Sequence, residues 1–249
     1  MEQNGYQNHD ICYLARVVLE SGTPLKIGSG HGNVKTDSAI LRDINDLPFI
    51  PATTLQGLLR HALADNSLAE RIMGWQKGDS GRGSFLTISE AKLVNYSGKP
   101  IDGMRDRTET DEDEVKFLRP FTMMPIRQHV RISHKGTAEK QGKFDEEVVV
   151  RGARFCFEMQ LEADAVDGEN DFLELLGHLK DKTFRIGGGS RKGFGKVKII
   201  RVDYCKLDFN NPDDFKAYMD KSACLSQSFS WYMPLTLKSK EQQVVTQYE

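Results

Sequence analysis

The fold is decided by residues 169–207, ENDFLELLGHLKDKTFRIGGGSRKGFGKVKIIRVDYCKL, which read as a helix, a glycine-rich loop and a strand. The helix is predicted from apolar residues at helical spacing, namely Phe172, Leu173, Leu175, Leu176 and Leu179. Alternating basic and apolar residues after the glycines predict the strand. Loops that bind nucleotide cofactors follow a strand and precede a helix, so that helix amides face the phosphate. Because the order here is reversed, the sequence does not favour a nucleotide cofactor.

The glycine-rich loop is nevertheless suited to an anionic partner. Glycine lets the backbone approach another chain closely, and successive amides can line an anion-binding concavity. Residues 182–202 hold seven basic residues and no acid, which is the local charge that phosphate binding requires. A flexible turn with a cationic edge is the simpler alternative. The residues expected to bind the anion are Gly187, Gly188, Gly189, Ser190, Arg191 and Lys192.

The rest of the chain extends this order of elements. We expect a strand at residues 11–22, a helix after Pro51, a strand at residues 84–96 and a strand from Val148. Residues 99–146 have no single period and predict a large excursion. The order predicts an α+β fold with a ferredoxin-like (RRM-like) β-α-β-β-α-β core and a thumb-like insertion between the middle strands. We expect one domain over residues 1–249, with the core at about 10–97 and 147–207, the insertion at about 98–146 and a peripheral tail at about 208–249.

Composition limits the classes of protein to which the chain can belong. Its 249 residues are 39% hydrophobic and 28% charged, with a formal net charge of −2, as in an ordinary globular protein. No apolar run approaches the roughly 20 residues that a membrane-spanning helix needs. The polar N-terminus lacks the features of a signal peptide, and the four cysteines form no CxxC pair. We therefore expect a cytoplasmic protein without a membrane partner or a zinc site.

Three stretches resemble motifs of the RAMP superfamily, the repeat-associated proteins of CRISPR systems. They are GGGSRKGFGKV at residues 187–197, AILRDINDLPFIPATTLQGLLRHAL at residues 39–63 and GKFDEEVVVRGARFCFEMQLE at residues 142–162. They occur in the expected order and are most similar to the repeated backbone subunit of type III CRISPR effector complexes. The resemblance implies a subunit that polymerises along a guide RNA and whose thumb enters the guide–target duplex. The implied partners are guide CRISPR RNA, complementary target RNA, and other copies of the chain or related RAMP subunits.

The resemblance also implies which residues hold RNA. Guide phosphates would be held by the glycine loop and by first-helix residues, namely Thr53, Thr54, Gln56 and Arg60. The superfamily usually has Gly-Ser-Ser-Leu-Lys-Gly in that helix, and the Ala-Thr-Thr-Leu-Gln-Gly of this chain lacks its lysine. The two threonines could instead only cap the helix. In the insertion, residues 123–126 would be an apolar wedge unless they pack beneath it. The RNA contacts there would come from Arg127, His129 and Arg131, with His134 and Lys135 nearby.

A catalytic role is implied for Asp37 in KTDSAILRD, residues 35–43. The segment resembles the Asp-Ser-Pro segment of the backbone subunit, whose aspartate is needed to cut target RNA. A carboxylate in a polar loop can bind a divalent cation such as Mg²⁺ or Mn²⁺, or help deprotonate the ribose 2′-hydroxyl that attacks the adjacent phosphate. One carboxylate is not a metal cage, so RNA phosphates would complete the coordination. Ala39 replaces the usual proline, and a solvated aspartate without a catalytic role is the alternative.

The sequence therefore predicts a guide-binding backbone subunit that is also an endoribonuclease, cutting paired target RNA at regular intervals through Asp37. A non-catalytic structural subunit of the same kind of complex is the first alternative. The second is a ribonuclease of the same superfamily that processes guide RNA, for which His31 or His61 would have to act as the catalyst.

Overall fold

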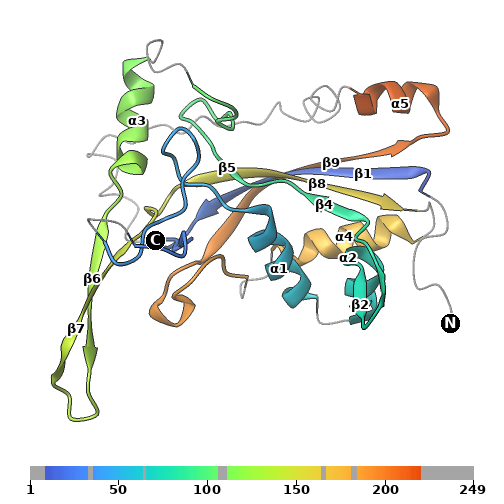
Figure 1. Ribbon diagram of the computed structural model, residues 1–249. Helices are drawn as coiled ribbons and strands as arrows, with labels where there is room; N and C mark the ends of the chain where they lie inside the picture. Colours follow the sequence, from blue (N-terminus) through green and yellow to red (C-terminus); the bar gives the residue numbers. More distant parts are fainter. Residues whose placement is uncertain are drawn as a thin grey trace, which may run out of the picture.

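The structure is a computed structural model that describes residues 9–32, 36–63, 66–105, 111–163, 167–180 and 184–219. An antiparallel sheet crosses the molecule with the strand order β4-β8-β1-β9, and β5 also pairs with β8 (Figure 1). The expected mixture of helices and strands is confirmed. The strands of this sheet are β1 (Ile11–Ser21), β4 (Leu86–Ile88), β5 (Lys92–Leu93), β8 (Arg154–Ala163) and β9 (Val197–Asp208).

The single strand expected at residues 84–96 is wrong, because β4 and β5 are separate. Between them, the backbone amide of Ser89 donates to the carbonyl of Glu158 at 2.9 Å, and the hydroxyl of Ser89 accepts from the amide of Glu158 at 2.9 Å. A side-chain oxygen thus takes the place of a backbone carbonyl in the second of these hydrogen bonds. A small hairpin, β2 (Trp75–Lys77) and β3 (Ser80–Arg82), precedes β4.

β1 is an inner strand of the sheet. It pairs with β8 along one side and with β9 along the other. Successive side chains on a strand point to opposite faces. Tyr13, Val17 and Leu19 accordingly pack into the main core, whereas Cys12 and Leu14 belong to a smaller cluster on the other face. Burial on both faces explains why almost every residue of this strand is apolar.

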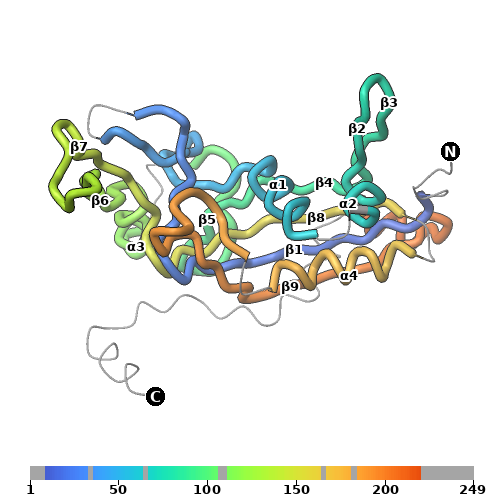
Figure 2. Tube along the Cα trace, turned by 90° about the horizontal axis from the view of Figure 1, so that it is seen from below, coloured from blue at the N-terminus to red at the C-terminus, as the bar shows by residue number. Residues whose placement is uncertain are grey.

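Two helices, α1 (Ala52–Ala62) and α4 (Gly168–His178), cover the main-core face of the sheet (Figure 2). α1 begins after Pro51 and buries Leu55 and Leu59, which lie one turn apart. Leu173 of α4, expected in the core, is 43% exposed. It lies on the outer side of α4, whereas Phe172, Leu175, Leu176 and Leu179 are buried as expected.

A third helix, α2 (Asn66–Met73), is tied to α4 by a charged pair. The guanidinium of Arg71 donates two hydrogen bonds of 2.7 Å to the buried carboxylate of Asp171. Such a bidentate pair fixes the relative orientation of the two helices as well as their distance.

The opposite face of the sheet carries α5 (Pro212–Met219), the last helix of the described residues. Tyr218 of α5 packs against the cluster of Cys12, Leu14 and Leu207. Elsewhere this face holds ion pairs, such as Arg16 with Glu158 at 2.5 Å, and a small buried cluster of Val18, Val94 and Cys156. Among the described helices, none is long and apolar enough to cross a membrane.

The segment between β5 and β8 forms a helix and a hairpin that project from one end of the sheet (Figure 1). They are α3 (Glu112–Thr122), β6 (Ile126–Ile132) and β7 (Ala138–Glu147). The acidic run starts α3, and the carboxylate of Asp111 caps it by accepting from the amide of Asp113. Glu114 of this run is 18% exposed, and its carboxylate lies 2.9 Å from the guanidinium of Arg105.

Candidate functional site

The glycine-rich loop packs against the segment that follows β1. Gly187 has φ +85°, and a Cβ added there would lie 2.3 Å from the carbonyl oxygen of Lys26. The amide of Gly188 donates to that same carbonyl at 2.8 Å. Gly189 has φ +76°, and a Cβ there would lie 2.8 Å from the ring of Phe194. The loop therefore needs glycine at 187 and 189 for both backbone conformation and space.

The side chains of this region converge on the carboxylate of Glu146, which is 6% exposed and lies near the end of β7. The ammonium of Lys26 lies 2.6 Å from Oε1 and that of Lys192 lies 3.4 Å from the same atom. Nε2 of His129 lies 3.2 Å from Oε2, although the pair lacks the alignment of a hydrogen bond. We call these four residues the Glu146 cluster. It joins the post-β1 loop, the β6–β7 hairpin and the glycine loop.

The cationic neighbours keep Glu146 ionised. Burial by itself would raise the pKa of this carboxyl, but the hydrogen bond and charge of Lys26, with the charges of Lys192 and His129, outweigh burial and hold the pKa below its usual value. Glu146 carries one negative charge and faces two ammonium groups, those of Lys26 and Lys192. The cluster therefore keeps a net positive charge that can attract an anion.

Two aromatic rings contact the side chains of the Glu146 cluster. The imidazole of His129 stacks on Phe144 at 5.2 Å between ring centroids and meets the edge of Phe194 at 6.4 Å. The ammonium of Lys192 lies 4.8 Å from the centroid of Phe144, a cation–π contact. Phe194 is buried. His129, expected to contact RNA, is thus held at the base of the hairpin, and its side chain is 24% exposed.

Asp37 lies beside the cluster on a segment that runs along the end of β7. Its Oδ2 accepts a hydrogen bond of 2.8 Å from the backbone amide of Asp145, the residue before Glu146. The hydroxyl of Thr36 donates to the Asp145 carbonyl at 2.8 Å, and Ser38 forms a bridge with Glu146. Asp37 is exposed, so its carboxylate is oriented by the backbone and open to a partner.

A divalent cation at Asp37 would need ligands beyond the carboxylates and imidazoles that the described residues bring together. Within the described residues there is no group of three or more histidine, cysteine, aspartate or glutamate side chains that could hold a metal ion. An exposed carboxylate oriented by an amide fits a hard cation that is mainly bound by phosphates and water. His31 is exposed, and its carbonyl accepts from the amide of Ala39 at 3.3 Å, which keeps the two sides of the loop together.

The first-helix residues have differing roles. The hypothesis that the threonine pair caps the helix is wrong, because Pro51 is the N-cap, no side chain caps it, and Thr53 and Thr54 lie in the first turn. Thr53 is exposed, and Thr54 and Gln56 are partly exposed. Arg60 donates to the carbonyl of Gly74 at 2.9 Å. Its guanidinium thus binds the backbone just after α2. Arg60 is exposed, and the guanidinium has further N–H donors.

The β6–β7 hairpin carries Arg127 and Arg131 on exposed positions, and His134 and Lys135 lie in its turn. The segment expected to be an apolar wedge is split. Met124 is 7% exposed and packs into the main core, whereas Met123 is 71% exposed.

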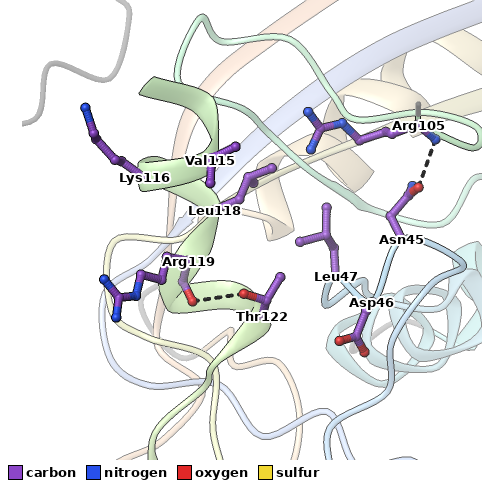
Figure 3. Close-up of a pocket in the computed structure, with 9 residues that line it drawn as sticks. All are labelled: Asn45, Asp46, Leu47, Arg105, Val115, Lys116, Leu118, Arg119 and Thr122. Atoms are coloured by element: carbon purple, nitrogen blue, oxygen red, sulfur yellow. Dashed lines mark hydrogen bonds between the residues drawn. The ribbon is translucent and has the colours of Figure 1, made fainter. Parts of the chain in front are cut away.

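A cavity of about 510 Å³ lies between α3 and the loop at residues 45–47 (Figure 3). Leu47, Val115 and Leu118 line it with apolar surface. The backbone amide of Arg105 donates to the side chain of Asn45 at 2.9 Å across one rim. This cavity lies on α3, away from the residues that the sequence singled out.

Sequence reasoning missed three residues of the site, namely Lys26, Phe144 and Glu146. Lys26 and Glu146 are 120 positions apart and meet only in the folded chain. No local pattern marks Glu146, which follows another acid and precedes a third in FDEE. The role of such a buried carboxylate can be recognised only from the folded structure, in which its cationic partners surround it.

The fold and the site define a mixed α/β protein in which a glycine-rich cationic loop and a projecting hairpin share one charged cluster. The sequence model of the RAMP superfamily matches residues 18–198. The chain belongs to the RAMP superfamily, which confirms the resemblance seen in its motifs.

Solved structures are similar in fold. One is a chain of the type III-B Cmr-beta complex in the apo state, with a TM-score of 0.58, 14% identity, and coverage of 75% of this chain and 96% of that chain. Another is a chain of type III-B Cmr-beta bound to cognate target RNA, with a TM-score of 0.53, 12% identity and the same coverage. At these identities the likeness concerns the fold alone. No curated protein matches the sequence.

Proposed function

We propose that this chain is a guide-RNA-binding backbone subunit of a type III CRISPR effector complex, located in the cytoplasm. Membership of the RAMP superfamily and the fold shared with Cmr-beta chains support this assignment. One observation carries it: the Glu146 cluster joins Lys192 of the glycine loop to His129 of the hairpin, close to Asp37. A single RNA strand could therefore contact the loop, the hairpin and the carboxylate together.

In this proposal the sheet with α1 and α4 is a ferredoxin-like core. The strand order β9-β1-β8-β4, with two helices on one face, is that of the β-α-β-β-α-β arrangement. The projecting hairpin with α3 is then the thumb-like insertion at about residues 98–146. Residues 208–249 are the peripheral tail, most of which lies outside the described residues.

Guide phosphates are bound by the glycine loop, Arg191 and Lys192, with further contacts from first-helix residues. Both Arg191 and Lys192 are exposed. Such contacts read no base, so they suit a subunit that must bind any guide sequence. Arg127 and Arg131 on the hairpin contact the guide–target duplex. Further copies of the chain, or related RAMP subunits, bind the next segments of the guide.

Target cleavage depends on Asp37. Mg²⁺ or Mn²⁺, when bound, stabilises negative charge on the phosphate and lowers the pKa of bound water. Asp37 contributes one carboxylate to that ion, and the amide of Asp145 fixes its orientation. As the alternative to binding the ion, the carboxylate helps to deprotonate the attacking 2′-hydroxyl. A purely structural subunit would keep the RNA contacts and lack this chemistry.

The test is a complex reconstituted with guide RNA and complementary target. Asp37→Ala should abolish cutting while target binding is retained, and Asp43→Ala on the same segment should cut normally. Asp43 is a suitable control because its carboxylate accepts from the amides of Asn45 and Leu47 in a local turn. Unchanged cutting by Asp37→Ala would favour the structural subunit or another catalytic residue. Cleavage of precursor guide by the isolated chain would support guide processing.

A further inference from the structure

A second cavity lies where α1 and α4 end, next to the glycine loop. Its volume is about 510 Å³, within the range of small-molecule sites. The polar residues that line it include His61 from the last turn of α1, His178 from the last turn of α4, Arg185 and Ser190. The residues proposed above to bind guide RNA do not include these two histidines.

The polar wall is suited to an anion. Among the described residues that line this cavity, none carries a carboxylate. Arg185 donates to the carbonyl of Phe194 at 3.2 Å, which anchors its guanidinium and leaves other N–H groups of the same fork for a ligand. Imidazole N–H, guanidinium and hydroxyl groups are all donors to phosphate oxygens.

Apolar groups also line the cavity. Leu58 of α1 and the buried ring of Phe184 contribute carbon surface to it. Inorganic phosphate would use only the polar groups. A ligand that contacts both kinds of group combines a phosphate with a less polar body of the size of a ribose and a base.

We propose that this cavity binds one nucleotide unit, with its phosphate against His61, His178 and Arg185 and its sugar or base against Leu58 and Phe184. The inference deepens the proposed function, because an RNA held by the glycine loop would supply such a unit. A free nucleotide presents the same chemistry.

The test is titration of the full chain with 5′-AMP and with adenosine, followed by the NMR signals of the imidazole rings. We expect 5′-AMP to shift the signals of His61 and His178, and adenosine to bind at least about tenfold more weakly, because a charge-assisted contact is lost. His61→Gln and His178→Gln should each weaken 5′-AMP binding by about tenfold. His9→Gln is the matched control, since His9 is an exposed histidine that contacts Phe85 outside the cavity.

Two results would overturn the inference: equal binding of 5′-AMP and adenosine, or wild-type affinity in the double histidine variant. Ser190→Ala, an exposed change with little effect on folding, is a second variant and should also weaken 5′-AMP binding. Competition identifies the source. Displacement of 5′-AMP by a short single-stranded RNA assigns the cavity to RNA, and simultaneous binding assigns it to a free nucleotide.

A parallel measurement separates this inference from the proposed function. If the wild-type chain binds 5′-AMP and fails to bind guide RNA in the reconstituted complex, the proposed function is wrong, and the cavity is still a nucleotide site. If guide RNA binds and 5′-AMP does not, the cavity is not a nucleotide site, and the proposed function is retained.

Discussion

The carboxylate of Glu146 lies 2.6 Å from the ammonium of Lys26, and the same oxygen lies 3.4 Å from Lys192. One side chain thereby connects the loop after β1 to the glycine loop, at the base of the β6–β7 hairpin. Because Glu146 is buried and its partners are more exposed, its charge fixes where those cations lie. The position of the hairpin relative to the glycine loop depends on this contact.

Replacement of Glu146 by glutamine should lower the free energy of unfolding by about 1–3 kcal/mol near neutral pH, since the variant keeps the shape and loses the charge that Lys26 and Lys192 face. The pKa of Glu146 is lowered in the folded chain, so its stabilisation is present above the pKa of the unfolded chain and is lost as pH falls through the folded pKa. The difference between wild type and Glu146→Gln in urea unfolding should therefore shrink in acid. Glu139→Gln, an exposed change on the same strand, should have little effect at either pH. Equal unfolding of the two variants at neutral pH would mean that the cluster does not stabilise the fold.

The thiol of Cys156 should resist alkylation in the folded protein. Burial raises the pKa of this thiol to about 12, so hardly any of the reactive thiolate exists near neutral pH. Peptide mapping after brief treatment with iodoacetamide should find Cys156 unmodified, and modified once urea is added. Rapid modification without denaturant would show that this part of β8 opens locally.

Local patterns and motifs predicted much of the fold, and contacts between distant residues account for what they missed. The long strands β1 and β8 and the helices α1 and α4 were expected, because each buries a regular set of apolar residues. Between β4 and β5 the hydroxyl of Ser89 accepts a hydrogen bond from the backbone of β8, a contact that no periodicity reveals. At the site, the glycine loop was singled out by its glycines and basic residues, and Asp37 by resemblance. Glu146 was missed, since a single acid in FDEE has meaning only beside Lys26 and Lys192.

Gly187→Ala should destabilise the protein more than Gly193→Ala does. The two glycines have nearly the same φ, +85° and +88°, so the left-handed backbone disfavours alanine equally at both, by about 1 kcal/mol. An added Cβ meets nothing within 4 Å at Gly193 but would lie 2.3 Å from the Lys26 carbonyl oxygen at Gly187. The extra loss at Gly187, measured by urea unfolding, reports the close packing of the loop on the post-β1 segment. Equal losses would show that this packing can relax freely.

The exposed cations of the glycine loop should determine how guide binding depends on salt. Each phosphate contact contributes about 0.7 to the slope of log affinity against log salt for a single strand, through release of counterions. The double variant Arg191→Gln and Lys192→Gln should thus weaken guide binding at low salt and flatten the slope by about 1–1.5. Lys77→Gln with Lys99→Gln removes the same charge from exposed positions elsewhere on the chain and should leave the slope nearly unchanged. If both double variants flatten the slope equally, general electrostatic attraction explains the binding, and the loop is not a specific grip on phosphate. If only the loop variant does so, the contacts are local, and the Glu146 cluster that anchors Lys192 becomes part of the RNA site.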